Sequence, residues 1–281
     1  MILQLPPTLF LLGVDDPEMR AMEHLLKEDQ REYRFATVTG KRVHPGNAYK
    51  ADPVDLTGYE QLVCVECSPR ALPSDITMVR IDHHRPGDPG YGLPPAQYGQ
   101  ASSLGQLVNF LGLEMELGSR EHLVLAAMDH APAAAIRGEC PGVSAKDVLD
   151  RKFAEIAAAT EYPVAAVRDR IAQMHEVISA SPILRIGNAD LIDTRALDLG
   201  TGYSLDLLSM QTAALAGGQS VLLKHRDREG GPEKWSISGH ASPTLIEAFM
   251  REWAPLHGLA GIYGVPNRGY AGGYVSPFER E

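Results

Sequence analysis

The chain has 281 residues, a formal net charge of −10 at pH 7 and 44% hydrophobic residues. This length and apolar content suffice for two hydrophobic cores, and we expect one larger and one smaller domain. The acidic balance argues against long nucleic acid as a partner, because such binding depends on a basic surface that neutralises phosphates. A small anionic substrate held by a few local cations is compatible with it.

The cysteine count and the hydropathy favour a cytoplasmic protein without a membrane partner. Three cysteines are too few for a disulfide framework, and neither a leader nor an apolar run of about 20 residues stands out. The "CVEC" pair, Cys64 and Cys67, has a zinc-like spacing but no second pair follows it, so we interpret Cys64 as a core residue. The oligomeric state is left open, a homo-oligomer included.

Apolar runs alternate with helical periodicity along the first half of the chain, which is typical of a parallel sheet. We predict strands at residues 7–14, 33–40, 60–68 and 75–82, and helices at 15–29, 101–112 and 121–138. Each predicted strand ends in polar residues, at the edge where an open α/β sheet places its chemistry.

An amphipathic helical segment follows at 144–181, interrupted at Tyr162-Pro163. Beyond it we predict further strands up to residue 200, a helix at 205–216, strands at 219–226 and 233–241, a helix at 243–252, and a glycine-rich loop that contains "NRGYAGGY". The predicted fold is α/β: a parallel-sheet domain at 1–150, a helical connector at 151–182, and a smaller α/β domain at 183–281.

Carboxylates and histidines gather at these strand and helix ends. They are Asp15, Asp16 and Glu18 after the first strand, Glu66 after the third, Asp82, His83 and His84 after the fourth, and Asp129 and His130 in a later helix. If the sheet is parallel, its strand ends converge on one edge. Oxygen and imidazole ligands suit Mn²⁺ or Mg²⁺, and two such ions can activate a water and stabilise a phosphoryl transfer.

The stretch "IDHH" at 81–84 resembles the motif of the DHH phosphoesterase superfamily, which includes RecJ nucleases, oligoribonucleases, cyclic-dinucleotide phosphodiesterases and manganese pyrophosphatases. Other motifs fall in the family's order: "DPE" at 16–18, Glu66 in "VECSP" and Asp129 in "AAMDHA". "NRGYAGGY" resembles the glycine-rich substrate loop of the DHH-associated C-terminal domain. The resemblance implies a divergent member of this family with two ions, Mn²⁺ or alternatively Mg²⁺.

Residue roles follow from the resemblance. The implied metal ligands are Asp16, Glu18, Glu66, Asp82, His83 and Asp129. The implied catalytic residues are His83 and His84, and the implied substrate-binding residues are Arg268, Gly269, Gly272 and Gly273. From their local context we add His130, which stands beside Asp129, as a catalytic proton donor, and Arg137, at a helix exit marked by glycines, as a substrate-binding residue.

The chain also departs from the family pattern. Residues 11–13, "LLG", offer no counterpart to the usual histidine before the first aspartate. Glu18 and Glu66 replace aspartates, and Arg268 or Tyr270 stands where the glycine-rich motif normally has a histidine. These departures put one metal position and the substrate specificity in question.

Simpler roles stay open for several of these residues. Asp16 also fits a helix N-cap, Asp129 could pair with Arg137, and Arg137 could be an ordinary surface arginine. We predict hydrolysis of a small phosphoester, such as a short oligonucleotide, a nucleotide or a cyclic dinucleotide. The alternatives are a nucleotide-binding or regulatory module that has lost catalysis, and a metal-dependent hydrolase of other esters.

Overall fold

The computed structural model describes residues 6–113 and 119–275. Its contacts group into unit 1, Met1–Ala131 with Glu139–Val143, and unit 2, Pro132–Gly138 with Ser144–Glu281. The predicted α/β class is confirmed, since unit 1 holds a parallel four-stranded sheet and unit 2 holds a separate mixed sheet. The domain limits at residues 150 and 182 stay a prediction.

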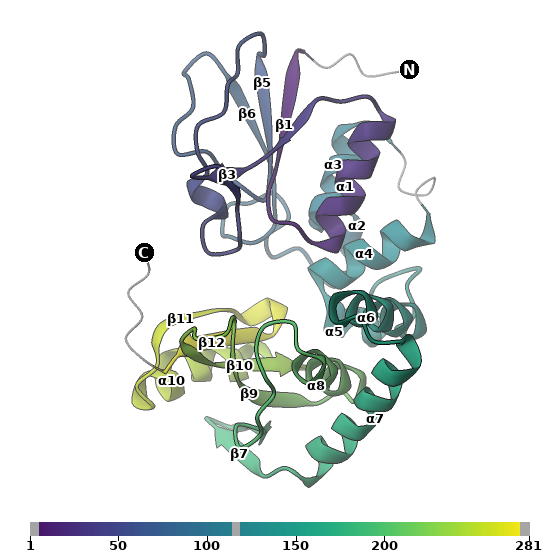
Figure 1. Ribbon diagram of the computed structural model, residues 1–281, viewed down its shortest axis with the longest axis vertical. Helices are drawn as coiled ribbons and strands as arrows, with labels where there is room; N and C mark the ends of the chain where they lie inside the picture. Colours follow the sequence, from purple (N-terminus) through teal and green to yellow (C-terminus); the bar gives the residue numbers. More distant parts are fainter. Residues whose placement is uncertain (1–5, 114–118, 276–281) are drawn as a thin grey trace. The chain divides into compact units, whose positions relative to one another are not determined.

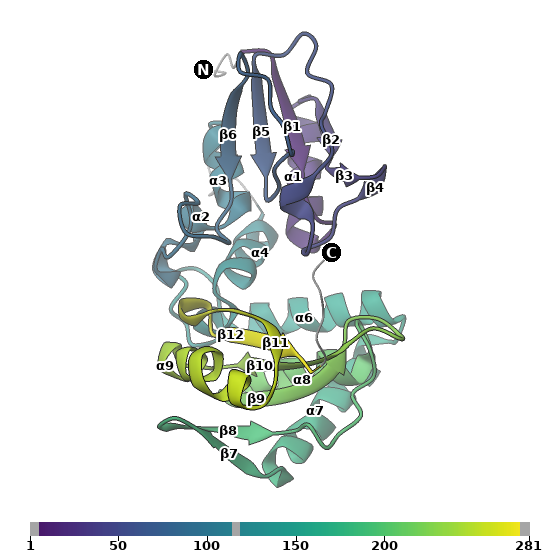
Figure 2. The same ribbon diagram turned by 90° about the vertical axis from the view of Figure 1, so that its left-hand side faces the viewer.

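The sheet of unit 1 has the order β2-β1-β5-β6, and all its strands run parallel. The strands are β1 (Thr8–Leu12), β2 (Tyr33–Phe35), β5 (Gln61–Val65) and β6 (Thr77–Ile81). Their arrowheads point the same way in Figure 2. The helices of unit 1 are α1 (Pro17–Glu28), α2 (Tyr98–Ala101), α3 (Ser103–Phe110) and α4 (Arg120–His130).

Alternating side chains of β1 separate the two faces of this sheet. Leu9 and Leu11 belong to a core with the segment 36–56, whereas Phe10 meets Phe110 of α3 edge-on at 5.9 Å. Helices α1 and α3 lie together over one face of the sheet (Figure 1). The sheet therefore lies between helices α1 and α3 on one face and the segment 36–56 on the other.

Two elements of unit 1 differ from the predictions. The strand expected at 33–40 is divided, because Ala36 bonds back to β1 while β3 (Thr37–Val38) pairs with β4 (Lys41–Arg42). The helix expected at 121–138 is also divided, into α4 and α5 (Pro132–Ile136). Ala131 leaves the helical conformation, with φ −152° and ψ 66°, before Pro132, whose ring disfavours a helical residue in front of it.

Unit 2 contains a six-stranded sheet of order β11-β12-β10-β9-β8-β7. The strands are β7 (Ile183–Ile186), β8 (Ala189–Asp193), β9 (Ser220–Arg226), β10 (Glu233–Gly239), β11 (Ala260–Val265) and β12 (Tyr270–Tyr274). The remaining helices are α6 (Ala145–Thr160), α7 (Val164–Ala180), α8 (Leu205–Ala216), α9 (Pro243–Ala248) and α10 (Ala254–Leu256). A π-helical turn, Phe249–Trp253, joins the last two.

Helices cover both faces of this sheet. The predicted connector, α6 and α7, shares a core with α8 through Ile156, Ile171 and Met210. On the other face Leu222 and Phe249 belong to the core under α9 and α10. Within the described part of the chain, no helix is long and apolar enough to span a membrane.

The prediction of a glycine-rich loop near the C-terminus is wrong. Gly272 and Gly273 lie inside β12, where they pair with Ser236 and Trp235 of β10. A Cβ on Gly272 would lie 2.3 Å from the Tyr263 hydroxyl, so close packing explains this glycine. The turn before the strand needs a left-handed residue, at Gly269 with φ +70°.

Candidate metal centre

The carboxyl ends of β1, β5 and β6 lie at one edge of the unit 1 sheet, as parallel pairing requires. Helix α1 begins just past β1 and carries Glu18 in its first turn. Glu66 directly follows β5, and the Asp82 motif directly follows β6. Helix α4 supplies Asp129 and His130 from its last turn.

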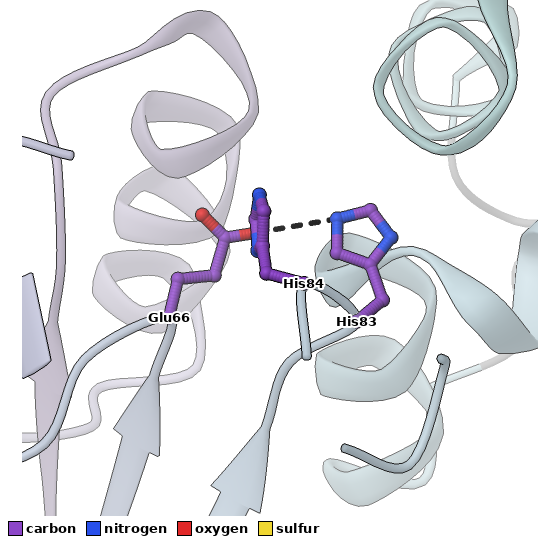
Figure 3. Close-up of side chains that lie close together, drawn as sticks. All are labelled: Glu66, His83 and His84. Carbon is purple, nitrogen blue, oxygen red and sulfur yellow. Dashed lines mark ion pairs between the residues drawn. The ribbon is translucent and has the colours of Figure 1, made fainter. Parts of the chain in front are cut away.

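Four side chains converge at this edge. One ligand atom from each of Glu18, Glu66, His83 and Asp129 lies within 4.8 Å of the others. An overlapping group joins Glu66 and His83 to His84. Figure 3 shows these last three side chains beyond the ends of the strands that precede them. The set combines three carboxylates with imidazole, which is a donor set for a first-row divalent ion.

The hydrogen bonds of His130 fix the tautomer of His83. His130 Nε2 lies 2.9 Å from the carbonyl of Leu93, which can only accept, so this nitrogen carries a proton. In neutral His130, Nδ1 is then the acceptor for His83 Nδ1, 3.3 Å away. In neutral His83 the proton is therefore on Nδ1 and the lone pair is on Nε2. This Nε2 lies 2.7 Å from Asp129 Oδ2 and 3.7 Å from Glu66 Oε1.

This arrangement requires a positive charge between the ring and the carboxylates. A lone pair on His83 Nε2 would repel an oxygen at 2.7 Å, so either a proton or a metal ion must bind there. No donor in the described part of the chain hydrogen-bonds Glu18 Oε2 or Glu66 Oε1, although both atoms are buried. Buried carboxylate oxygens that lack protein donors fit a bound cation.

The same crowding perturbs the carboxyl groups. Burial, then the charge of Asp129, raises the pKa of Glu66 to about 8. Burial also raises the pKa of Glu18 well above its ordinary value, with Asp129 and Glu66 as the next causes. Glu18 keeps one protein partner, because its Oε1 accepts the Leu104 amide of α3 at 3.0 Å.

Backbone geometry at the end of β5 aims Glu66 into the group. Glu66 has φ +50°, a left-handed conformation that non-glycine residues rarely adopt. Gly13 packs directly against it, and a Cβ at position 13 would lie 2.8 Å from the carbonyl oxygen of Glu66 and 2.9 Å from that of Val65. Position 13 therefore has no room for a ligand side chain.

Asp16 caps α1, since its Oδ1 accepts the Met19 amide at 2.8 Å. It does not belong to either group of converging ligand atoms. Burial raises its pKa to about 6, and the charge of Asp129 adds to the shift. The cap is thus observed, while a metal role for Asp16 stays a prediction.

Asp82 is fully engaged by protein donors. Its Oδ1 lies 2.7 and 3.1 Å from the amides of His83 and His84 and 2.9 Å from His84 Nδ1. Its Oδ2 accepts the Tyr49 hydroxyl at 2.8 Å. Burial acts to raise the pKa of Asp82, but the hydrogen bonds of His84 and Tyr49 outweigh it and lower the pKa. Asp82 therefore orders the motif, and its predicted role as a ligand stays a prediction.

The predicted substrate-binding residues lie in unit 2. Arg137 Nη1 donates to His240 Nδ1 at 3.1 Å, and His240 Nε2 donates to the Leu215 carbonyl at 2.7 Å. Arg268 lies over the Tyr270 ring at 5.9 Å, directly before Gly269. The roles of Arg137, Arg268 and the nearby glycines as phosphate-binding groups stay a prediction.

Two contributors were missed from the sequence. Tyr49 comes from a segment without periodicity, and no sequence signal connects it to Asp82. The Leu93 carbonyl that orients His130 is a backbone atom, so residue type gives no signal for it.

Comparison with known proteins identifies no family. No protein-family model matches the sequence, and no curated protein matches it. Among solved structures, a pGpG-specific phosphodiesterase, PggH of Vibrio cholerae, resembles the chain with 11% identity and a TM-score of 0.37, over 96% of this chain and 93% of that one. A similarity this weak leaves the case for function to the site itself.

Proposed function

We propose that the protein is a metal-dependent phosphoesterase that hydrolyses a small phosphoester, such as a short oligonucleotide, a nucleotide or a cyclic dinucleotide. The observation that carries the proposal is that His83 Nε2 lies close to the carboxylate oxygens of Asp129 and Glu66, an arrangement that needs a cation between them. The resemblance of "IDHH" and the neighbouring acidic motifs to DHH phosphoesterases supports the same chemistry.

Glu18, Glu66, His83 and Asp129 would hold the cation, and the oxygen-rich donor set favours Mn²⁺ or Mg²⁺. When bound, such ions supply Lewis-acid activation of a phosphoryl group and of the attacking water. The buried surroundings of Glu18 and Glu66 keep the electrostatic interactions strong.

His84 is the residue we assign to proton transfer. Asp82 accepts from its Nδ1, which fixes the ring and stabilises a protonated imidazole. Its Nε2 is then the nitrogen that gives a proton to the leaving oxygen. The His84 side chain is 34% exposed, unlike the fully buried His83, so a substrate can reach it.

The test is turnover of an aryl phosphodiester and of a short oligoribonucleotide panel by metal-stripped protein, before and after adding Mn²⁺. The informative variant is Asp129→Asn, which removes a ligand charge at constant size. The matched control is Asp55→Asn, which changes the charge equally at an exposed position of unit 1.

We expect Mn²⁺-dependent turnover that is lost in Asp129→Asn and kept in Asp55→Asn. Stoichiometric Mn²⁺ and nucleotide binding without turnover would support the regulatory module instead. Turnover of carboxylic esters but no phosphoester would support the other hydrolase class, and an absence of metal binding would overturn the proposal.

A further inference from the structure

Arg85 is an exposed cation beside the proposed metal centre, in a chain with a net charge of −10. Its guanidinium carbon lies 3.2 Å from the centre of the Tyr49 ring. No carboxylate among the described residues forms an ion pair with it. The guanidinium is therefore held in place by a ring and not by an acid.

Hydrogen bonds with Asp88 fix the backbone at Arg85. Its amide donates to Asp88 Oδ2 at 2.7 Å, and the Asp88 amide donates back to the Arg85 carbonyl at 3.0 Å. The Asp88 carboxylate is buried and also receives Arg80 Nη1 at 3.0 Å. This closed turn limits the conformational entropy that Arg85 would lose on binding an anion.

Tyr49 connects Arg85 to the catalytic motif. The ring under Arg85 belongs to the same side chain whose hydroxyl donates to Asp82, and Asp82 in turn holds His84. Arg85 and the proposed proton donor are thus positioned by one contiguous set of contacts.

Arg42, another arginine of unit 1 that stacks on an aromatic ring, differs from Arg85 in having further partners. Arg42 lies over the Phe35 ring at 4.0 Å, but it also donates to the Gly13 carbonyl and lies 3.9 Å from Asp15. Arg42 therefore has a structural role that accounts for its position. A surface cation–π contact explains where Arg85 lies, but it uses only the face of the guanidinium. None of the Arg85 side-chain N–H groups donates a hydrogen bond to a described residue.

The acidic residues of the metal centre make a nearby cation useful for binding an anion. Three acidic side chains stand together there, and once they ionise to bind the ion they offset its positive charge, which weakens the attraction of the ion for a phosphate. We propose that Arg85 binds a phosphate oxygen of the substrate and that Tyr49 is its positioning residue. This inference rests on the proposed function, and it assigns to Arg85 the recognition of the substrate phosphate.

Kinetics and binding test the proposal together. KM and kcat for the aryl phosphodiester, and calorimetric affinity for a 5′-phosphorylated diribonucleotide, are measured on Mn²⁺-loaded protein. The variants are Arg85→Ala, Arg85→Lys and Tyr49→Leu. Arg34→Ala is the matched control, because Arg34 is an exposed arginine of β2 that donates to the Asp55 carbonyl.

We expect Arg85→Ala to raise KM and the dissociation constant about 10- to 100-fold, the range for a charged hydrogen bond, while kcat changes much less. Arg85→Lys should recover part of the loss, because it restores the charge without the forked donors. Tyr49→Leu should weaken binding in the same direction, and Arg34→Ala should match the wild type.

The outcomes separate this inference from the proposed function. Wild-type turnover with unchanged KM and affinity in Arg85→Ala overturns the role of Arg85 and leaves the phosphoesterase standing. Binding without turnover, weakened in Arg85→Ala, supports Arg85 and overturns the enzyme. Wild-type protein that neither binds nor hydrolyses the two probes overturns both.

Discussion

Raising the pH from 6 to 8 should strengthen Mn²⁺ binding at the proposed centre. A metal ion needs ionised carboxylates, so it must displace any proton that the metal-free site holds. Burial and the charge of Asp129 raise the pKa of Glu66 to about 8, so at pH 6 this group holds a proton in the absence of metal. Burial shifts Glu18 in the same direction.

The size of the effect follows from the shift. Ionising a group two pH units below its pKa costs about 2.7 kcal/mol, which corresponds to about a 100-fold loss of affinity at pH 6. At pH 8 the cost for Glu66 is nearly gone. Displacement of a proton from Glu18 as well would steepen the dependence beyond tenfold per pH unit.

Isothermal titration calorimetry at pH 6, 7 and 8 measures this directly. Repeating each titration in buffers of different ionisation enthalpy counts the protons released per Mn²⁺. Glu66→Gln should lower the affinity and release about one proton fewer at pH 6, whereas Asp55→Asn should behave as the wild type. A dissociation constant that stays constant across this range, without proton release, would refute the reasoning.

Three further outcomes follow from the same geometry. Glu66 is protonated in both the folded and unfolded states below about pH 4.5. As the pH rises from there toward the folded pKa of about 8, the unfolded state ionises more readily and the folded state loses stability. Chelated protein should therefore have a lower Tm at pH 8 than at pH 6, and Mn²⁺ should reverse the loss. A Tm in chelator that rises with pH would contradict this. His130→Ala should weaken Mn²⁺ binding about 10- to 100-fold by freeing the ring of His83, and calorimetry would show an unchanged affinity if the orientation did not matter. Gly13→Ala should cost about 1–3 kcal/mol of unfolding free energy in urea, because its Cβ would press on the carbonyl of Glu66; an unchanged midpoint would mean that the strand ends separate easily.

The sheet of unit 1 was predictable because its strands are short, buried apolar runs separated by helical periodicity. The failures have local causes. At Ala36 the chain passes from β2 to the hairpin of β3 and β4, which splits a run that looks continuous in the sequence. Pro132 ends a helix whose apolar pattern continues past it. Glycine density at 269–273 predicts a loop, but Gly272 and Gly273 lie inside β12, where Gly272 packs against Tyr263 and Gly273 against Leu259.

The candidate ligands were predictable for a different reason. Carboxyl ends of parallel strands meet, so residues that are distant in sequence, such as Glu18 and Glu66, could be expected together. Asp129 lies on helix α4, and the order of the DHH-like motifs is what placed it with them. Which atoms face each other depends on rotamers and on backbone carbonyls. Only the structure shows that His83 Nε2 turns to the carboxylates while His84 Nδ1 turns to Asp82.

Asp82 allows its two candidate roles to be separated by one substitution. Both of its oxygens accept protein hydrogen bonds, and neither lies in the groups of converging ligand atoms. Asp82→Asn keeps the size and one oxygen but loses the charge that holds His84. If Asp82 acts through His84, Mn²⁺ affinity should stay near the wild-type value while kcat falls about 10²- to 10⁴-fold, the usual contribution of a positioned proton donor. A loss of Mn²⁺ affinity equal to that of Asp129→Asn would instead place Asp82 among the ligands, because removal of a group that only orients the ring leaves the ion's own donors intact.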